Sequence, residues 1–398
     1  MNITLVVSDL SASGAGRWGD AVRPFLLTKA LQSLGHRIKI IGFNNGESVV
    51  QSSPELPIAE IVSGIYPQFF QSARQMLRSL EADPDCDLIY AYKLKPSSFG
   101  LALLHRYRQS GAKTPVFLDI DDWELSWHGG DSFRYRPTPR QLYRDVFKSE
   151  SALRNPDDPF YLQQMERFVS QANHVTTHNA FLQGRFGGTY VPNGKDICLF
   201  NPENYDPEAS RDRFNLTPYR TLMFPGAPRP YKGVEDILTA LDILDEPDLR
   251  LVIVGGSPYD QYDQQLTQQW GHRLIKLPRT PYSQMPEIIS AAHAIVVPQR
   301  DNPATKAQFP LKLTDGMAMA KPILATRVGD VPEILGDAGY LVDSNSPQQL
   351  ADGIRTLFSE FDTAQQKGQQ ARQRCIEHYS IEAMAKTLES ILPARPLA

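Results

Sequence analysis

The residues best suited to chemistry lie in one stretch, residues 298–342, which reads PQRDNPATKAQFPLKLTDGMAMAKPILATRVGDVPEILGDAGYLV. The stretch predicts the order strand, loop and helix twice over. Pro310 suits the first turn of a helix, and the free N–H groups beside it predict an anion site. Asp315 follows one turn into the helix, within hydrogen-bond reach of a sugar diol. We therefore expect a cradle for phosphate and ribose, although Lys312 offers Asp315 a plain surface ion pair as the alternative.

A loop rich in glycine and proline, GAPRPYKG at residues 226–233, is the second feature. It follows the apolar strand TLMF and leads into a predicted helix. Arg229, through its bidentate fork, and Lys232, as a compact charge, would neutralise a departing diphosphate without a metal. A solvated basic loop is the alternative reading. The position directly before a helix N-terminus favours the anion site.

Acidic residues end a predicted strand in the sequence DIDDW, residues 119–123. Period-two alternation places Asp119 and Asp121 on one face and Asp122 on the other. Two carboxylates invite a divalent metal, but hard cations usually need more oxygen ligands, so no metal site is predicted. We expect these carboxylates to line a cleft, where one of them contacts donor or acceptor hydroxyls.

Three glycines spell GxGxxG between the first predicted strand and the first helix, at Gly14, Gly16 and Gly19. This spacing suggests a dinucleotide site, but the second strand, RIKIIGFNNG, lacks the acid that would hold an adenosine ribose. A simple glycine turn is another reading. We favour a loop that approaches a donor phosphate or sugar closely because Gly14 and Gly16 lack Cβ atoms.

Aromatic and basic residues alternate through residues 123–148, and Arg136, Arg140 and Arg144 recur at helical spacing. One reading is an amphipathic face for a membrane or a polyprenyl-diphosphate acceptor. The other is a packed aromatic flap. Peripheral membrane contact through this segment is therefore open.

The elements that must position these residues alternate as strand and helix along the whole chain, which predicts α/β architecture with doubly wound parallel sheets. A length of 398 residues exceeds what one core organises, so we expect two Rossmann-like domains facing each other across a cleft. Residues 1–200 would form the acceptor side and residues 201–379 the donor side. Residues 197–218 read as the linker, and the last helix, within residues 380–398, would pack back on the first domain. Ligands would lie outside the carboxyl ends of the strands.

The composition describes an ordinary globular protein, with 41% hydrophobic residues, 22% charged residues and a formal net charge of −4. No basic field for nucleic acid follows from this balance. The three cysteines are far apart and form no CxxC or Cys/His motif, so neither a disulfide scaffold nor a zinc site is predicted. MNITLVVSD enters a strand at once without a basic leader, so the expected location is the cytoplasm.

The order of motifs resembles glycosyltransferase family 4, retaining enzymes of the GT-B fold. The segments that carry the resemblance are YVPNGKDICLFNP, GAPRPYKGVEDILTAL and PLKLTDGMAMAKPILATRVGDVPEIL. The resemblance implies a hexosyl or related transferase that moves a sugar, with retention, from a nucleotide-sugar donor. The implied acceptor is a glycan, a lipid-linked molecule or a small molecule, and no metal or bound cofactor is expected.

The resemblance assigns roles on the donor side. Arg229 and Lys232 would hold the diphosphate, Asp315 the ribose, and the backbone of residues 309–311, at Phe309, Pro310 and Leu311, the phosphate or sugar. The first of the family's paired glutamates is Ala307 here, and Gln308 is its candidate substitute. A nucleotide-sugar-binding protein with weak or no catalysis is therefore the alternative function.

Three further residues belong to the expected catalytic or acceptor side. Asp121 stands where many members keep a histidine, and it is a catalytic candidate. His178 is the reserve candidate. Asn193 of the PNG segment is expected near the acceptor or the sugar. The nucleotide, the sugar, the acceptor, the linkage and the oligomeric state do not follow from these residues.

Overall fold

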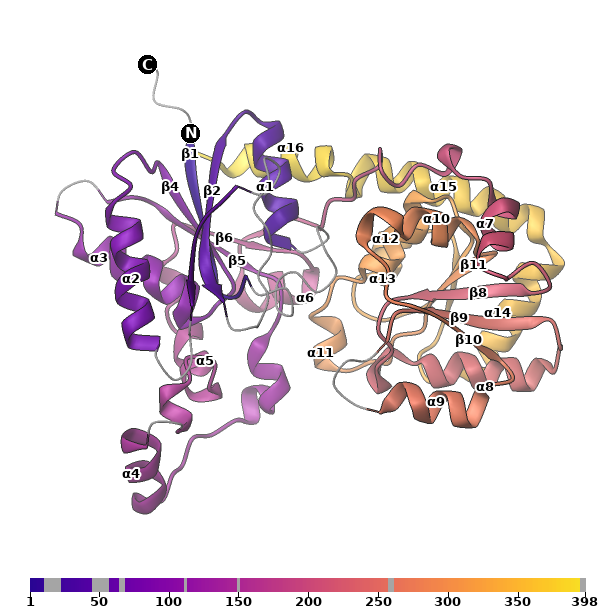
Figure 1. Cartoon of the computed structure of the whole chain (residues 1–398), viewed down its shortest axis with the longest axis horizontal. Coiled ribbons are helices and arrows are strands. Elements are labelled where there is room, and N and C mark those ends of the chain that lie inside the picture. Colours follow the sequence, from indigo (N-terminus) through magenta and orange to yellow (C-terminus); the bar gives the residue numbers. More distant parts are fainter. Residues whose placement is uncertain are drawn as a thin grey trace. The chain divides into compact units, whose positions relative to one another are not determined.

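The computed structural model describes residues 1–10, 23–44, 57–63, 69–110, 113–148, 151–256 and 261–393, and divides the chain into two compact units. Unit 1 comprises Met1–Pro192 with Met384–Ala398, and unit 2 comprises Asn193–Ala383 (Figure 1). The division falls at Pro192, before the predicted boundary at residue 200. The reason is local, because the backbone of Lys195 is hydrogen-bonded to that of Tyr379 and Ile381 within unit 2.

The described part of unit 1 contains a parallel sheet of seven strands in the order β3-β2-β1-β4-β5-β6-β7. Its strands are β1 (Asn2–Val7), β2 (Arg37–Asn44), β3 (Ile58–Ser63), β4 (Leu88–Tyr92), β5 (Val116–Ile120), β6 (His174–Thr177) and β7 (Thr189–Tyr190). The strand order reverses between β1 and β4, where open α/β sheets bind ligands. All residues of β4 and β5 are buried, as expected for parallel strands covered on both faces.

Helices connect these strands, and the predicted doubly wound pattern is confirmed. They are α1 (Arg23–Ser33), α2 (Phe69–Glu81), α3 (Leu101–Arg108), α4 (Pro139–Phe147), α5 (Pro159–Glu166) and α6 (Ala180–Phe186). The last helix, α16 (Ile381–Ile391), begins in unit 2, and its residues from Met384 on are grouped with unit 1.

The described part of unit 2 repeats the architecture with six parallel strands in the order β10-β9-β8-β11-β12-β13. Its strands are β8 (Arg220–Pro225), β9 (Leu249–Val254), β10 (Leu274–Leu277), β11 (Ala294–Val297), β12 (Ile323–Thr326) and β13 (Tyr340–Val342). Its helices are α7 (Pro207–Arg213), α8 (Val234–Leu244), α9 (Tyr262–Trp270), α10 (Met285–Ser290), α11 (Pro303–Lys306), α12 (Leu311–Ala318), α13 (Val331–Leu335), α14 (Pro347–Ser359) and α15 (Phe361–Tyr379). Here the strand order reverses between β8 and β11.

The predicted linker at residues 197–218 contains a helix, α7. The carboxylate of Asp206 caps it by accepting the N–H groups of Glu208 and Ala209, and Pro207 occupies its first turn. An Asp-Pro sequence is a helix start as well as a loop signal, so composition alone did not distinguish the two.

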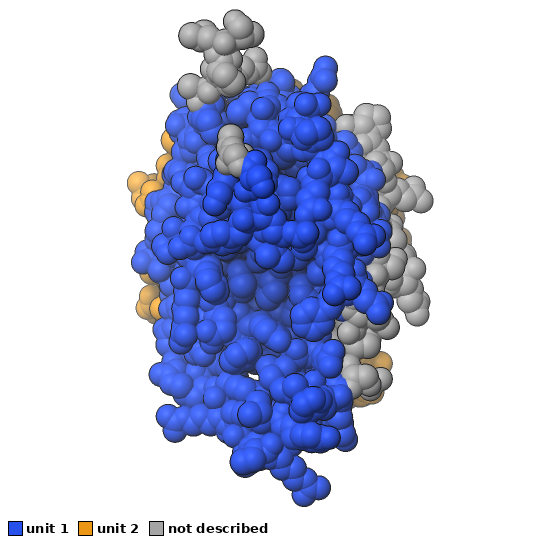
Figure 2. All heavy atoms as spheres, turned by 90° about the vertical axis from the view of Figure 1, so that its left-hand side faces the viewer, with its two compact units in different colours: residues 1–192, 384–398 blue, residues 193–383 orange. Residues whose placement is uncertain are grey.

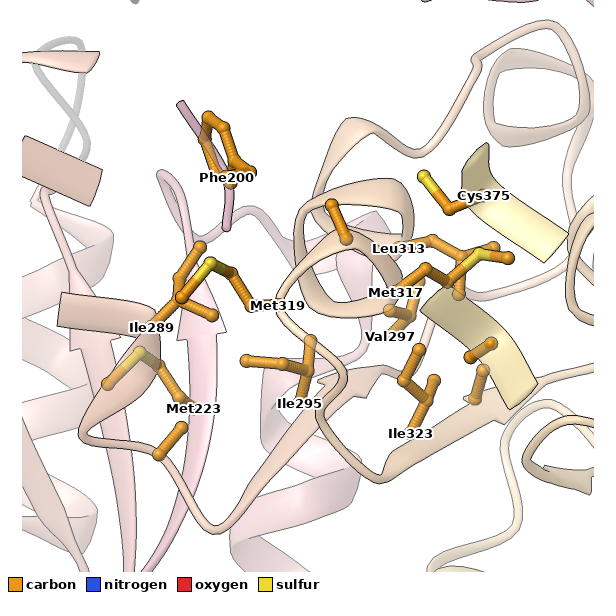
Figure 3. Close-up of a cluster of buried hydrophobic side chains, with 14 of the residues drawn as sticks. Phe200, Met223, Ile289, Ile295, Val297, Leu313, Met317, Met319, Ile323 and Cys375 are labelled. Carbon is orange, nitrogen blue, oxygen red and sulfur yellow. The ribbon is translucent and has the colours of Figure 1, made fainter. Parts of the chain in front are cut away.

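One face of α12 fixes the position of the predicted cradle in unit 2. Leu313 and Met317, one turn apart, are fully buried and point into an apolar cluster with Ile295 of β11 and Cys375 of α15 (Figure 3). A Cβ added to Gly316 would lie 2.8 Å from the Ile295 side chain, so the helix approaches the strand closely. This packing fixes the direction in which the polar residues of α12 point.

Candidate functional site

The loop after β8 carries two of the predicted cations and is held by its glycines. Gly226 has φ of 138° and Gly233 has φ of 69°, both in the region that favours glycine. A Cβ on Gly233 would lie 1.9 Å from the carbonyl oxygen of Pro298, the residue after β11. The amide of Arg300 also donates to the carbonyl of Tyr231 at 3.0 Å. The loops that follow β8 and β11 therefore pack directly on each other at the switch point of the sheet.

This packing brings Lys232 and Lys312 to the same loop. Lys232 Nζ donates to the carbonyl of Ala227 at 3.0 Å. The side chain of Lys312 passes within 3.9 Å of the Cβ position of Gly226, and its Nζ lies 4.6 Å from the ring centre of Phe224. Lys312 is buried at the start of α12, with 9% exposure. Lys312 therefore belongs to the same cationic cluster as Lys232. The sequence reading had considered Lys312 only as a partner of Asp315 in a surface ion pair.

The electrostatics of this cluster favour an anion. Burial lowers the pKa of Lys232 well below its ordinary value, and the charges of Lys312 and Arg229 lower it further. Burial also lowers the pKa of Lys312 to about 8, although Asp315 opposes the shift. Within the described residues, no carboxylate oxygen lies within salt-bridge distance of Lys232 or Lys312. A bound dianion would relieve this repulsion and restore both ammonium charges.

The alternative reading, a surface ion pair between Lys312 and Asp315, is wrong. Asp315 instead forms a short ion pair with Lys195, which is 1% exposed. The hydroxyl of Tyr282 accepts from the same Nζ at 3.3 Å. The Asp315 side chain keeps 14% exposure, so the carboxylate is reachable from outside the protein. Lys195 comes from the PNGKD segment and was missed from sequence.

The residues before α12 form a compact turn. Pro310 is the residue preceding the helix rather than its first turn, and α12 begins at Leu311. Phe309 is buried, its carbonyl accepts the amide of Leu311 at 2.9 Å, and Gln308 is half-buried. Ala307 is fully buried, and its methyl side chain offers no polar group to a ligand.

In unit 1, the strand-end carboxylates have different environments from those predicted. Asp119 is fully buried and makes a bidentate ion pair with Arg23 of α1, at 2.6 Å from Nε and 2.7 Å from Nη2. Thr176 of β6 donates its hydroxyl to the same carboxylate at 2.6 Å. Asp119 therefore joins α1, β5 and β6 inside the unit, and the expectation that it lines a cleft is wrong.

Asp121 lies beyond the end of β5, so strand alternation does not relate it to Asp119. Its side chain is 15% exposed, it accepts a short hydrogen bond from the Tyr92 hydroxyl, and Lys93 Nζ lies 3.5 Å away. Burial, together with the charge of Asp121, raises the pKa of Tyr92 well above its ordinary value, so this hydroxyl remains a donor. Asp121 is therefore a fixed carboxylate at the strand ends of unit 1.

The neighbouring carboxyl group of Asp122 has a raised pKa. Burial, with Glu124 nearby, raises the pKa of Asp122 to about 7, and the Trp127 indole donates to it at 3.0 Å. Burial alone would raise the pKa of Glu124, but Lys93 and Lys95 lower it to about 2. Asp122 can therefore hold a proton near neutral pH.

Four predicted site residues remain, and they do not lie together in one described site. His178 is buried in unit 1, immediately after β6, with 4% exposure. Asn193 is 5% exposed and is grouped with unit 2, whereas the sequence reading placed it in the first domain. Gly14 and Gly16 lie outside the described residues.

The part of the chain that contains the unit 2 site is similar to known proteins. Residues 207–374 match the family model described as glycosyl transferases group 1. A D-inositol 3-phosphate glycosyltransferase from Corynebacterium glutamicum is 30% identical over 220 residues, which are 50% of this chain and 50% of that protein. The chain thus spans about half the length of the curated relatives that it matches.

Solved structures resemble the chain over nearly its full length. A glycosyltransferase from Rickettsia africae has a TM-score of 0.71 at 17% identity and covers 98% of this chain and 97% of its own. The Anabaena protein HepE, in complex with UDP and glucose, has a TM-score of 0.70 at 16% identity and covers 98% of both chains. These similarities show the fold, two parallel α/β units of the GT-B type.

Proposed function

We propose that the chain is a retaining glycosyltransferase that moves a sugar from a nucleotide-sugar donor to a glycan, lipid-linked or small-molecule acceptor. The observation that carries this proposal is the cluster of Arg229, Lys232 and Lys312 at the switch point of the unit 2 sheet. A diphosphate supplies negative charge beside Lys232 and Lys312, and the cations stabilise it as it departs. The similarity to the group 1 glycosyl transferases, and the UDP bound by HepE, support the same ligand class.

Each donor group then has a proposed partner. Lys232 and Arg229 hold the departing diphosphate without a metal, and Lys312 adds a third cation. Asp315 accepts a hydrogen bond from the ribose, and the backbone near Phe309 meets the phosphate or sugar. With Ala307 buried and apolar, the donor sugar relies on other polar groups, among which Gln308 is the proposed substitute.

The acceptor side is proposed for unit 1. Asp121, fixed by Tyr92 and Lys93, is the carboxylate proposed to meet a reacting hydroxyl. His178 and Asn193 remain candidate acceptor or sugar contacts.

Incubation with UDP-, GDP-, ADP- and dTDP-sugars tests the proposal. Release of a nucleoside diphosphate with transfer or hydrolysis of one sugar supports the enzyme. Binding without turnover, with acceptors present, would favour the binding-protein alternative. A thermal shift with NAD or NADP and none with a nucleotide sugar would instead favour the dinucleotide reading of the glycine loop.

The pH dependence of nucleoside diphosphate affinity follows from Lys312. Its pKa in the free protein is about 8, and a bound anion favours the ammonium form. Below that pH, Lys312 is charged before and after binding. Above it, binding must take up a proton on Lys312, so this residue alone lowers affinity by as much as about tenfold per pH unit, while the terminal phosphate stays ionised.

Calorimetric titrations between about pH 7 and pH 9.5, in buffers of different ionisation enthalpy, measure this uptake. Lys321→Met is the matched control, because burial also lowers the pKa of Lys321 to about 8 while its Nζ donates to the Ser290 carbonyl. The control should keep the pH dependence and Lys312→Met should weaken it. An unchanged dissociation constant across this range in the wild type would contradict the role of Lys312.

We also propose that α4 makes peripheral contact with an anionic membrane surface. The only buried residue of α4 is Asp145, which accepts a hydrogen bond from Tyr135 at 3.0 Å. The exposed apolar residues are Leu142 (45%), Tyr143 (67%), Val146 (39%) and Phe147 (66%). The helix therefore turns its carboxylate inward and its apolar side chains outward.

Position and charge support a membrane as the partner of α4. The helix lies at one end of unit 1, away from the sheet in Figure 1, and the lower projection of unit 1 in Figure 2 corresponds to it. Arg140 and Arg144 recur one turn apart beside the apolar face and are exposed. The flap reading holds for the part of the segment before α4, where Trp123 is 7% exposed and the ring of Tyr135 packs on that of Phe160. No helix among the described residues has the length and hydropathy needed to cross a bilayer.

Liposome flotation tests this contact. The wild type is expected to float with anionic vesicles at low salt and to be released as salt rises, because lipid charge and apolar burial act together. Tyr143→Asp with Phe147→Asp should abolish flotation, whereas Phe168→Asp, at an exposed aromatic of unit 1 outside α4, should leave it intact. Absence of wild-type flotation at low salt would remove the membrane proposal.

A further inference from the structure

A buried lysine holds the carboxylate that we assign to the ribose. Lys195 Nζ donates to Asp315 Oδ1 and to the Tyr282 hydroxyl. It also lies 4.5 Å from the ring centre of Phe200 and 5.3 Å from that of Tyr282. Burial opposes its charge, but Asp315 raises the pKa of Lys195 above its ordinary value. The ammonium is therefore charged and enclosed by one carboxylate and two aromatic rings.

The backbone of Lys195 is fixed from the opposite side. Its amide donates to the carbonyl of Tyr379 at 2.7 Å, and its carbonyl accepts the amide of Ile381 at 3.1 Å. A Cβ on Gly194 would lie 2.8 Å from the Cα of Ile381, so the two segments are in close contact. The Lys195 side chain consequently extends from a backbone position that is held by hydrogen bonds at the junction of α15 and α16.

Asp315 is held through one oxygen only. Oδ1 pairs with Lys195, and among the described residues no hydrogen bond to Oδ2 is found. The side chain remains 14% exposed. One carboxylate oxygen is thus oriented by the protein while the other is available to a ligand.

We propose that Lys195 is a positioning residue for the nucleotide ribose, which orients Asp315 so that its second oxygen accepts a ribose hydroxyl. This inference rests on the proposed function, because it takes Asp315 as the ribose contact. The pair also neutralises Asp315. An uncompensated carboxylate near Lys312 would compete with a diphosphate for the cationic cluster.

The ribose and the phosphates should contribute to the binding free energy through different residues. Lys195 should control discrimination between ribose and deoxyribose, whereas Lys232 and Lys312 control the phosphate contribution. A hydrogen bond to a charged group contributes enough for about tenfold or more in affinity. Loss of Lys195 should remove that factor. When Asp315→Asn is added, no uncompensated carboxylate remains beside Lys312, and pyrophosphate affinity should stay within about threefold of the wild type.

Calorimetry with uridine, guanosine and adenosine diphosphates and their 2′,3′-dideoxy counterparts tests the inference. The wild type should prefer the ribose form of its nucleotide by about tenfold or more, and Lys195→Met should reduce this preference to within about twofold. Asp315→Asn should do the same, and the double variant Lys195→Met/Asp315→Asn should be no worse than either, because both residues act on one contact. The double variant also avoids an unpaired buried charge, and circular dichroism verifies its fold.

The outcomes distinguish this inference from the proposed function. If ribose preference persists in Lys195→Met, the positioning role is wrong and the diphosphate site stands. If the two single losses add in the double variant, Lys195 acts separately from Asp315 and the inference is also overturned. If no nucleoside diphosphate binds the wild type, the proposed function fails and this inference fails with it.

Discussion

Replacing Lys232 by methionine is expected to reduce kcat/KM for sugar transfer by about 100- to 1,000-fold, the usual loss when one preorganised donor to a developing anion is removed. The aliphatic stem is largely retained, so the change concentrates on the ammonium. The same variant should unfold at a higher temperature. Burial and the neighbouring cations Lys312 and Arg229 disfavour the Lys232 charge in the free protein, and methionine removes that cost.

Lys321→Met is again the appropriate control, since it removes a half-buried lysine of unit 2 that lies before β12 rather than at its carboxyl end and whose Nζ donates to the Ser290 carbonyl. It should leave kcat/KM unchanged. If Lys232→Met keeps turnover within about threefold of the wild type, the leaving-group role of Lys232 is wrong. A fall in both turnover and unfolding temperature would show instead that Lys232 is structural.

Asp119→Ala is expected to destabilise unit 1 by about 3–5 kcal/mol, because it leaves the Arg23 guanidinium buried without its carboxylate. The Thr176 hydroxyl loses its acceptor at the same time. Urea unfolding followed by tryptophan fluorescence measures this change in a Trp270→Phe background, because the other three of the four tryptophans precede residue 192.

A surface pair of the same unit supplies the control for Asp119. Arg108 and Glu81 are 54% and 42% exposed, so Glu81→Ala should change stability by less than about 1 kcal/mol. An Asp119→Ala variant with the wild-type unfolding midpoint and a raised acceptor KM would contradict the structural role. That result would support the earlier prediction that the Asp119 carboxylate contacts a hydroxyl of the donor or acceptor.

The sequence predicted the parallel architecture and the two donor loops well, because local patterns encode them. Strand-helix alternation predicts that the loops after all parallel strands lie at one edge of the sheet, and GAPRPYKG lies in the loop after β8. Residues 303–315 follow β11. No side-chain contact had to be known in advance for the topology to bring Lys232 and the start of α12 together.

The partners of buried charges could not be predicted, because they come from distant parts of the chain. Lys195 and Asp315 are separated by 120 positions, and Arg23 and Asp119 by 96. The sequence did contain a signal for Lys195. This lysine lies in VPNGKDICLF, between the apolar residues at the two ends of the segment, and a buried lysine requires a partner. Period-two reasoning failed at Asp121 because β5 ends one residue earlier, at Ile120.

Besides α7, the strand β3 and the helix α14 are among the elements that the sequence reading missed. The short strand β3, IAEIVS, follows a stretch rich in Ser and Pro and reads as loop. The helix α14 begins with Pro347, and its buried residues Leu350, Ile354 and Leu357 recur at helical spacing. The periodic signal was therefore present for α14, whereas β3 is specified mainly by its pairing with β2.

Calorimetric titration of nucleotide sugars and their nucleoside diphosphates into the wild type and the Lys232→Met/Lys312→Met variant shows whether the unit 2 cations form the donor site. We expect one binding site per chain in the wild type for one nucleotide class, with the diphosphate bound more tightly than the monophosphate. The variant should lose this binding while remaining folded. Equal affinity in both proteins, or no binding of any nucleotide diphosphate to the wild type, would contradict the assignment of the unit 2 cation cluster as the donor site.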